Sequence, residues 1–352
     1  MSYNDERELE YIKRPRWSSG SVPWINHDTP TFMRRKYAFS PDRLEGADVA
    51  IIGAPYVASW GPLFSVDKAL WYAAAKRVRQ QSARYVSGYL QSLDLDVFEH
   101  LKVVDFGDAE IPEEIYAEPT VNHILAAQDA VGVKVRQALD AGAIPIVIGQ
   151  NSPVGSYAIA KVIAERTKGN VGMISIDTHW DIEPIDDLTM DPEIAGSTSW
   201  KGKMYEFHNN MLQKNLVEIG EHGCLLDDGK EQIREFLKKG THFYPMWTVR
   251  QKGIEWLCKE IKYAYENTEA VYLHFDMDVM GGAGPSPGDV LGQLVEPIGM
   301  SDYEILRLAF EIGKKGFDAL SFICIPPGSA AGYRVVVMTI MYILAGKILS
   351  DK

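Results

Sequence analysis

The chain has 352 residues, and 46% of them are hydrophobic, enough to bury a full core in one large domain or two smaller ones. Its 36 basic and 48 acidic residues give a formal net charge of −12, which argues against nucleic acid or an anionic membrane as a partner. No apolar run approaches the ~20 residues needed to cross a bilayer, and the charged start resembles no secretory signal. The three cysteines are widely spaced, as reduced thiols are, so we expect a soluble cytoplasmic protein.

The character of the chain changes near residue 45. Residues 1–44 are polar and charged, and prolines interrupt any long helix there. We predict an extended N-terminal arm at 1–44, which either lies across a neighbouring subunit or stays free as a mobile tail. Beyond it, strand-like apolar runs alternate with segments of helical spacing, which predicts one α/β domain at 45–352. Its fold class is three-layer, with a mostly parallel central sheet and helices on both faces. The expected helices include 66–90, 123–141 and 158–166, and the expected strands include 144–148, 171–174 and 270–273.

Two short motifs carry side chains that bind metals. The motif S-I-D-T-H-W-D at 175–181 follows the strand expected at 171–174, and H-F-D-M-D at 274–278 follows the one at 270–273. Alternation along an extended segment places the acidic and imidazole side chains of each motif on one face. Such a set suits a divalent cation such as Mn²⁺, Ni²⁺ or Zn²⁺, although solvated aspartates beside one satisfied histidine are an alternative. The candidate ligands are Asp177, His179, Asp181, Asp276 and Asp278.

These two motifs resemble those of the ureohydrolases, the family of arginase, agmatinase and guanidinobutyrase. Its members carry S-x-D-A-H-x-D and S-x-D-x-D around a two-metal site that activates water against a guanidine carbon. The segments D-V-A-I-I-G-A-P at 48–55 and V-V-D-F-G-D at 103–108 are similar to other family segments. The resemblance covers about residues 44–350 and implies an arginase-like fold.

Four positions depart from the pattern of the family. Asn151 stands where G-D-H-S has a metal-binding histidine, and an amide oxygen is a weaker ligand than imidazole for these metals. Lys201 stands where the H-G-T histidine shuttles a proton; we expect a solvated or salt-bridged lysine rather than a desolvated base. Gly281 replaces a third carboxylate. Ser321, by the best alignment of the last strand, replaces the glutamate that grips the guanidinium.

The departures affect four separate catalytic tasks, which favours a pseudoenzyme that binds at most one divalent cation. The resemblance then implies a mixed hexamer with a catalytically active ureohydrolase paralogue that holds Ni²⁺ or Mn²⁺. The hydrolase of metformin (dimethylbiguanide), which releases dimethylamine and guanylurea, is such an assembly, and this sequence resembles its auxiliary subunit. Two alternatives stay open: an active agmatinase-like or guanidinobutyrase-like hydrolase with an altered metal site, and a guanidine-binding regulatory module.

Overall fold

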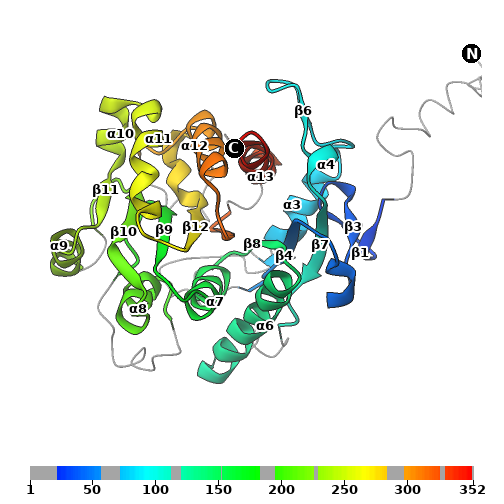
Figure 1. Cartoon of the computed structure of the whole chain (residues 1–352), viewed down its shortest axis with the longest axis horizontal. Helices are drawn as coiled ribbons and strands as arrows, with labels where there is room; N and C mark the ends of the chain where they lie inside the picture. Colours follow the sequence, from blue (N-terminus) through cyan, green and yellow to red (C-terminus); the bar gives the residue numbers. More distant parts are fainter. Residues whose placement is uncertain are drawn as a thin grey trace, which may run out of the picture.

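A nine-stranded parallel sheet forms the middle layer of the molecule (Figure 1). The strands follow the order β11-β10-β9-β12-β13-β8-β4-β7-β3. Their bounds are β3 (Lys36–Tyr37), β4 (Val49–Gly53), β7 (Val103–Asp108), β8 (Ile144–Ile148), β9 (Val171–Ile176), β10 (Met211–Ile219), β11 (His242–Tyr244), β12 (Ala270–Asp276) and β13 (Ala319–Ile323). This computed structural model describes residues 22–56, 72–111, 120–151, 153–182, 195–225, 229–283, 297–325 and 330–350.

Helices cover both faces of the sheet, so the predicted three-layer fold is confirmed. One apolar core lies between the sheet and the layer that contains α6, α7 and α8, and a second lies under α3 and α10 to α13. The central strands are buried along their whole length because both their faces are covered, which explains their continuous apolar runs. The helices are α3 (Ala74–Ser82), α4 (Val97–His100), α6 (Val121–Asp140), α7 (Ala158–Arg166), α8 (Trp200–Phe207), α9 (Lys230–Lys238), α10 (Met246–Lys252), α11 (Ile254–Glu260), α12 (Asp302–Lys315) and α13 (Ala330–Ile348).

The predicted helices agree with the structure where it describes them. The helix expected at 158–166 is α7, and that expected at 123–141 is α6, which begins two residues earlier because the Thr120 side chain caps it by accepting from the His123 amide. The helix expected at 66–90 is shorter: α3 ends at Ser82, and residues 66–71 lie outside the described part of the chain.

The N-terminal boundary needs a correction. Residues 36–37 form β3, which pairs with β7 at the edge of the sheet, and Phe32 is fully buried. The Phe32 amide donates to the Asp105 carboxylate at 2.7 Å, and the buried Arg79 guanidinium donates to the same carboxylate at 2.8 and 2.9 Å. The described part of the predicted arm therefore belongs to the domain. Ahead of β3 lie β1 (Trp24–Asn26), β2 (Thr29–Pro30) and the 3₁₀ helix η1 (Phe32–Arg34), and after it lies η2 (Pro41–Leu44); residues 1–21 are outside the described range.

One helix, α13, has the length and composition to span a membrane, with a mean hydropathy of 1.4. The sequence analysis overlooked this helix because its apolar residues are interrupted by single polar ones. Most of α13 is buried, and it packs against α12 with Val336, Ile340 and Leu344 in the core. The helix is a core element of this fold.

The contact between α12 and α13 depends on glycine. A Cβ added at Gly313 would collide with the backbone carbonyl of Ile343, and one at Gly346 would collide with that of Phe310. Two helices whose backbones approach this closely leave no room for a methyl group unless one of them shifts.

We predict that Gly313→Ala lowers the free energy of unfolding by about 1–3 kcal/mol, the usual cost of overpacking a core. Urea denaturation of the two proteins measures the difference. Gly132→Ala in α6 is the control, because the added Cβ would meet only the mobile end of the Arg136 side chain. Equal unfolding free energies for Gly313→Ala and the wild type would contradict the close packing.

Candidate functional site

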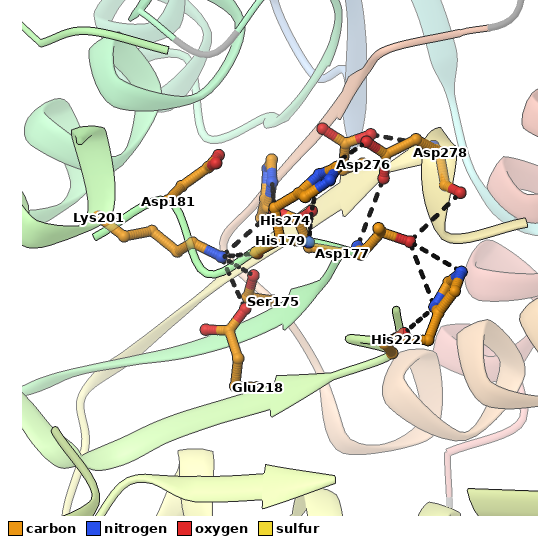
Figure 2. A network of polar contacts seen from close by, with 12 residues as sticks. Ser175, Asp177, His179, Asp181, Lys201, Glu218, His222, His274, Asp276 and Asp278 are labelled. Carbon is orange, nitrogen blue, oxygen red and sulfur yellow. Dashed lines mark hydrogen bonds and ion pairs between the residues drawn. The ribbon is translucent and has the colours of Figure 1, made fainter. Parts of the chain in front are cut away.

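The two sequence motifs meet at the carboxyl edge of the sheet. β9 and β12 are adjacent and parallel, with Ile176 opposite Phe275, so Asp177 and Asp276 follow side by side. β13, next to β12, and β8, next to β13, end at the same edge. Figure 2 shows how the acidic and histidine side chains from these strand ends converge.

Asp177, His179 and Asp278 form the set that best suits a cation. Their ligand atoms all lie within 4.8 Å of one another. The His179 Nδ1 is 3.1 Å from an oxygen of Asp278 and 3.9 Å from Oδ1 of Asp177. The same Asp177 oxygen accepts a hydrogen bond from the His179 backbone amide at 2.7 Å. Two buried carboxylates and one imidazole fit a borderline divalent cation such as Mn²⁺.

The carboxyl groups of this cluster are buried close together, which disfavours their ionised forms. Burial first, and then Asp278 and Asp177, raise the pKa of Asp276 well above its ordinary value. Burial by itself would lower the pKa of His179, but the carboxylates of Asp278, Asp177 and Asp181 outweigh it and raise that pKa to about 9. A bound cation would offset this concentration of buried negative charge.

Lys201 provides a permanent positive charge beneath this cluster (Figure 2). It lies in the first turn of α8 and is fully buried. Its ammonium donates to Glu218 at 2.6 Å, to the Ser175 hydroxyl at 3.0 Å, to the His179 carbonyl at 3.1 Å and to Asp177 at 3.3 Å. The expectation of a salt bridge is correct, and that of a solvated side chain is wrong because α8 covers the ammonium. Burial alone would lower the pKa of Lys201, but Glu218 and Asp177 outweigh it and raise the pKa, so this side chain is held as an ammonium.

Three further candidate residues remain, and two of them, Asp181 and Asn151, form hydrogen bonds with residues outside the cation set. Asp181 accepts a hydrogen bond from the Trp200 indole at 2.8 Å, and burial, followed by Asp177, raises its pKa well above the ordinary value. Asn151 follows β8 and donates its amide to the Ser197 hydroxyl at 3.0 Å. Gly281 lies in the 3₁₀ segment η5 (Met277–Ala283) after β12 and offers no ligand atom of a side chain.

Ser321 is a buried residue within β13, and its hydroxyl bonds the Tyr272 hydroxyl at 2.6 Å. β13 ends at Ile323, two residues past Ser321, and the next residue, Cys324, lies close to Asp276 and Asp278. The place of Ser321 as the counterpart of the guanidinium-gripping glutamate, which the alignment gives within a residue or two, stays a prediction.

His274 is a site residue that the sequence analysis did not include. Its Nε2 lies 3.5 Å from Asp177 and has no hydrogen-bond partner among the described residues, and its Nδ1 lies 3.1 Å from the Ser156 hydroxyl. With Asp177 and Asp276 it forms a second group of converging ligand atoms. The signal was the H-x-D spacing to Asp276, because residues two apart on a strand share a face.

A cavity of about 670 Å³ opens above the cluster. Thr178, His179, Asp276 and Asp278 line its floor, and the floor also includes Glu221, at the end of β10. Most of the wall is aromatic or aliphatic. Its described lining residues include Trp180, Ile182, Leu225, Ile233, Phe243, Trp247 and Ile298. The cavity and the cation set are contiguous, so a bound molecule would touch both.

Comparison with known proteins identifies the family to which this fold and site belong. Residues 47–327 match the arginase family. The chain belongs to the arginase family. The match covers every strand of the sheet except β3, together with the cation set and all four departing positions, so the departures are changes within the family.

The relatives and solved structures agree with this assignment. The formimidoylglutamase of Rhodococcus jostii is 28% identical over 229 residues, which are 62% of this chain and 64%, just under two thirds, of that protein. The structure of the Bacillus subtilis formimidoylglutamase has a TM-score of 0.73 at 19% identity, covering 98% of this chain and 100% of that one. Trypanosoma cruzi formiminoglutamase, solved with Mn²⁺, has a TM-score of 0.69 at 22% identity over 92% of this chain and 100% of that one.

We predict that Lys201→Met lowers the free energy of unfolding by about 3–5 kcal/mol, because it leaves Glu218 and Asp177 buried without their cation. Urea denaturation in the presence of a chelator measures the loss. Lys259→Met, at an exposed lysine, is the matched control and is expected to stay near the wild type. A loss below about 1 kcal/mol for Lys201→Met, the range of an exposed ion pair, would contradict the buried ion pairs.

Proposed function

We propose that this chain is an auxiliary subunit of a hetero-oligomeric arginase-family hydrolase and has little activity alone. The observation that carries the proposal is the Lys201 ammonium among the carboxylates of the cation site. Two-metal hydrolysis depends on a pair of cations that together lower the pKa of a water and stabilise charge on the reacting group. A fixed ammonium 3.3 Å from Asp177 opposes a second cation there.

The remaining residues support a site for one cation. Asp177, His179 and Asp278 would hold it, with Asp276 beside them. Asn151 and Asp181, which match metal-ligand positions of the family, are engaged with Ser197 and Trp200. In this role the cation neutralises the carboxylate cluster and holds the side chains of the cavity floor in position.

The partner in this proposal is a catalytically active arginase-family paralogue that holds Ni²⁺ or Mn²⁺, within a mixed hexamer in the cytoplasm. Its reaction is hydrolysis of a C–N bond in a guanidine or biguanide, as in the hydrolysis of metformin to dimethylamine and guanylurea. The aromatic and aliphatic wall of the cavity favours a planar cation with apolar substituents over an amino acid. The described cysteines are all free, as a reducing compartment requires.

A second candidate function is an active hydrolase with an altered metal site. The observation in its favour is His274, whose Nε2 points at Asp177 from β12 and could replace the imidazole lost at Asn151. The group Asp177, His274 and Asp276 would then hold a second cation. Metal-binding variants distinguish the two functions, because only the second one gives His274 a ligand role.

We predict that calorimetric titration with Mn²⁺ gives one equivalent per chain. His179→Ala should weaken this binding by more than the ~10–100-fold that follows loss of an outer-shell partner, since a direct ligand is removed. His274→Asn is the control at an equally polar neighbour and should leave the stoichiometry at one. Two equivalents in the wild type, falling to one in His274→Asn, would instead establish the altered two-metal site.

We predict that the purified chain hydrolyses metformin and agmatine at least ~100-fold more slowly than its mixture with the active paralogue, because general acid–base catalysis alone contributes ~10²–10⁴-fold. Release of dimethylamine or urea from the chain alone, from the paralogue alone and from co-expressed chains measures this. Equal rates for the chain alone and the mixture would contradict the auxiliary role. Tight guanidine binding without turnover in any mixture would favour a regulatory module.

A further inference from the structure

Glu221 is a buried acid on the cavity floor, and no described lysine or arginine forms an ion pair with it. Its side chain is 6% exposed, and neither carboxyl oxygen makes a hydrogen bond within the described part of the chain. It follows Gly220 at the carboxyl end of β10, where φ of the glycine is +111°, and its backbone carbonyl accepts from the Met246 amide at 3.0 Å. The backbone is therefore fixed while the carboxyl group faces the cavity.

The charged neighbours of Glu221 do not provide it with a cationic partner at hydrogen-bond distance. Lys201 already donates to four acceptors, among them Glu218. Glu218 repels Glu221 when both are ionised, and burial followed by this repulsion raises the pKa of Glu221 well above its ordinary value. Glu221 also belongs to none of the groups of described residues whose ligand atoms converge for a metal. A buried carboxyl group without a donor is costly, so it marks a place where a bound molecule supplies one.

The charge of the cavity selects the sign of that molecule. Its described lining includes Asp181, Glu221, Asp276 and Asp278 but no lysine or arginine. A ligand carboxylate would find no cationic side chain among these lining residues, whereas a ligand cation would face four acidic ones. This lining favours a ligand without a carboxylate.

The wall of the cavity selects a flat or apolar body. Trp180 and Phe243 pack with their ring centroids 4.7 Å apart and form one side of it. Trp247 and Ile298 also line the cavity, although 67% of Trp247 and 45% of Ile298 are exposed. The backbone of Ile298 is strained, with a φ of +75°. Exposed apolar side chains at a cavity suit contact with alkyl groups or a planar cation.

We propose that Glu221 is the anionic partner of an alkyl-substituted guanidinium or amidinium ligand that carries no carboxylate. It takes over from β10 the task that Ser321, buried within β13, cannot perform. The inference rests on the proposed function in treating the cavity as a guanidine site, but it concerns binding and does not require the chain to be inactive. N–H groups of the ligand would donate to the two carboxyl oxygens, as in other bidentate pairs.

The test is calorimetric binding of three matched probes to the full chain with saturating Mn²⁺: butylguanidine, 4-guanidinobutyrate and the neutral butylurea. Butylguanidine should bind at least ~10-fold more tightly than 4-guanidinobutyrate, which differs chiefly by a carboxylate. Glu221→Gln should weaken the binding of butylguanidine by at least ~30-fold, because it removes one partner of a buried charge pair. The same substitution should leave the affinity for butylurea unchanged. Glu221→Asp, which keeps the charge, should recover part of the affinity.

The control is Glu206→Gln, the same substitution at an exposed position of α8 outside the described cavity lining. Thermal unfolding of each variant checks that it folds, and Trp247→Ala, at an exposed residue, tests the wall independently with an expected loss of butylguanidine affinity. Equal butylguanidine binding by Glu221→Gln and the wild type overturns the inference, as do tighter binding of 4-guanidinobutyrate and no binding of butylguanidine. Turnover of butylguanidine by the chain alone would overturn the auxiliary role, while loss of its binding in Glu221→Gln would still support Glu221.

Discussion

The buried ammonium of Lys201 determines how the rest of the site is arranged. It joins the end of β9, through Asp177 and Ser175, to β10, through Glu218. A charge taken out of water needs such partners, because an unpaired one costs several kcal/mol. The cluster of carboxylates that can accommodate a lysine here is the same cluster that can accommodate metal ions. The lysine and a full set of cations therefore compete for the same negative charge.

The segment around the start of α8 provides hydrogen-bond partners for Asn151 and Asp181. Ser197 accepts from Asn151, and the Trp200 indole donates to Asp181. The Lys201 amide also donates to the Asp181 carbonyl. These contacts connect the two departing positions Asn151 and Lys201 through one stretch of chain. A structural network has formed at this point of the arginase fold, which explains why the substitutions are compatible with a stable core.

Much of the fold could be predicted because it depends on local patterns. The apolar runs at 144–148 and 171–174 are buried on both faces, and Asp177 and Asp276 follow strands whose ends must meet if the sheet is parallel. The edge strand β3 could not be predicted in this way. It has two residues, and its place depends on pairing with β7, which lies far away in sequence.

The site was only partly predictable for a different reason. Motif spacing brought Asp177, His179 and Asp278 together, but a family motif directs attention only to the positions that it contains. His274 stands where the second motif of the family has a serine, and Glu221 is outside both motifs, although strand alternation indicates the first and a glycine turn after an apolar strand marks the second. Sequence similarity does not reveal where β13 ends, so the position of Ser321 within the strand emerged only from the fold. Burial and unpartnered polar atoms, which only the structure reveals, identified His274 and Glu221.

The most direct test of the central claim is a count of cations in crystals of the wild-type chain soaked in Mn²⁺. Anomalous scattering locates each ion independently of any activity. A single peak between Asp177, His179 and Asp278, with the Lys201 ammonium still bonded to Glu218, is the result expected here. Two peaks that share Asp177, with Lys201 displaced from it, would contradict the idea that the lysine prevents a second cation from binding.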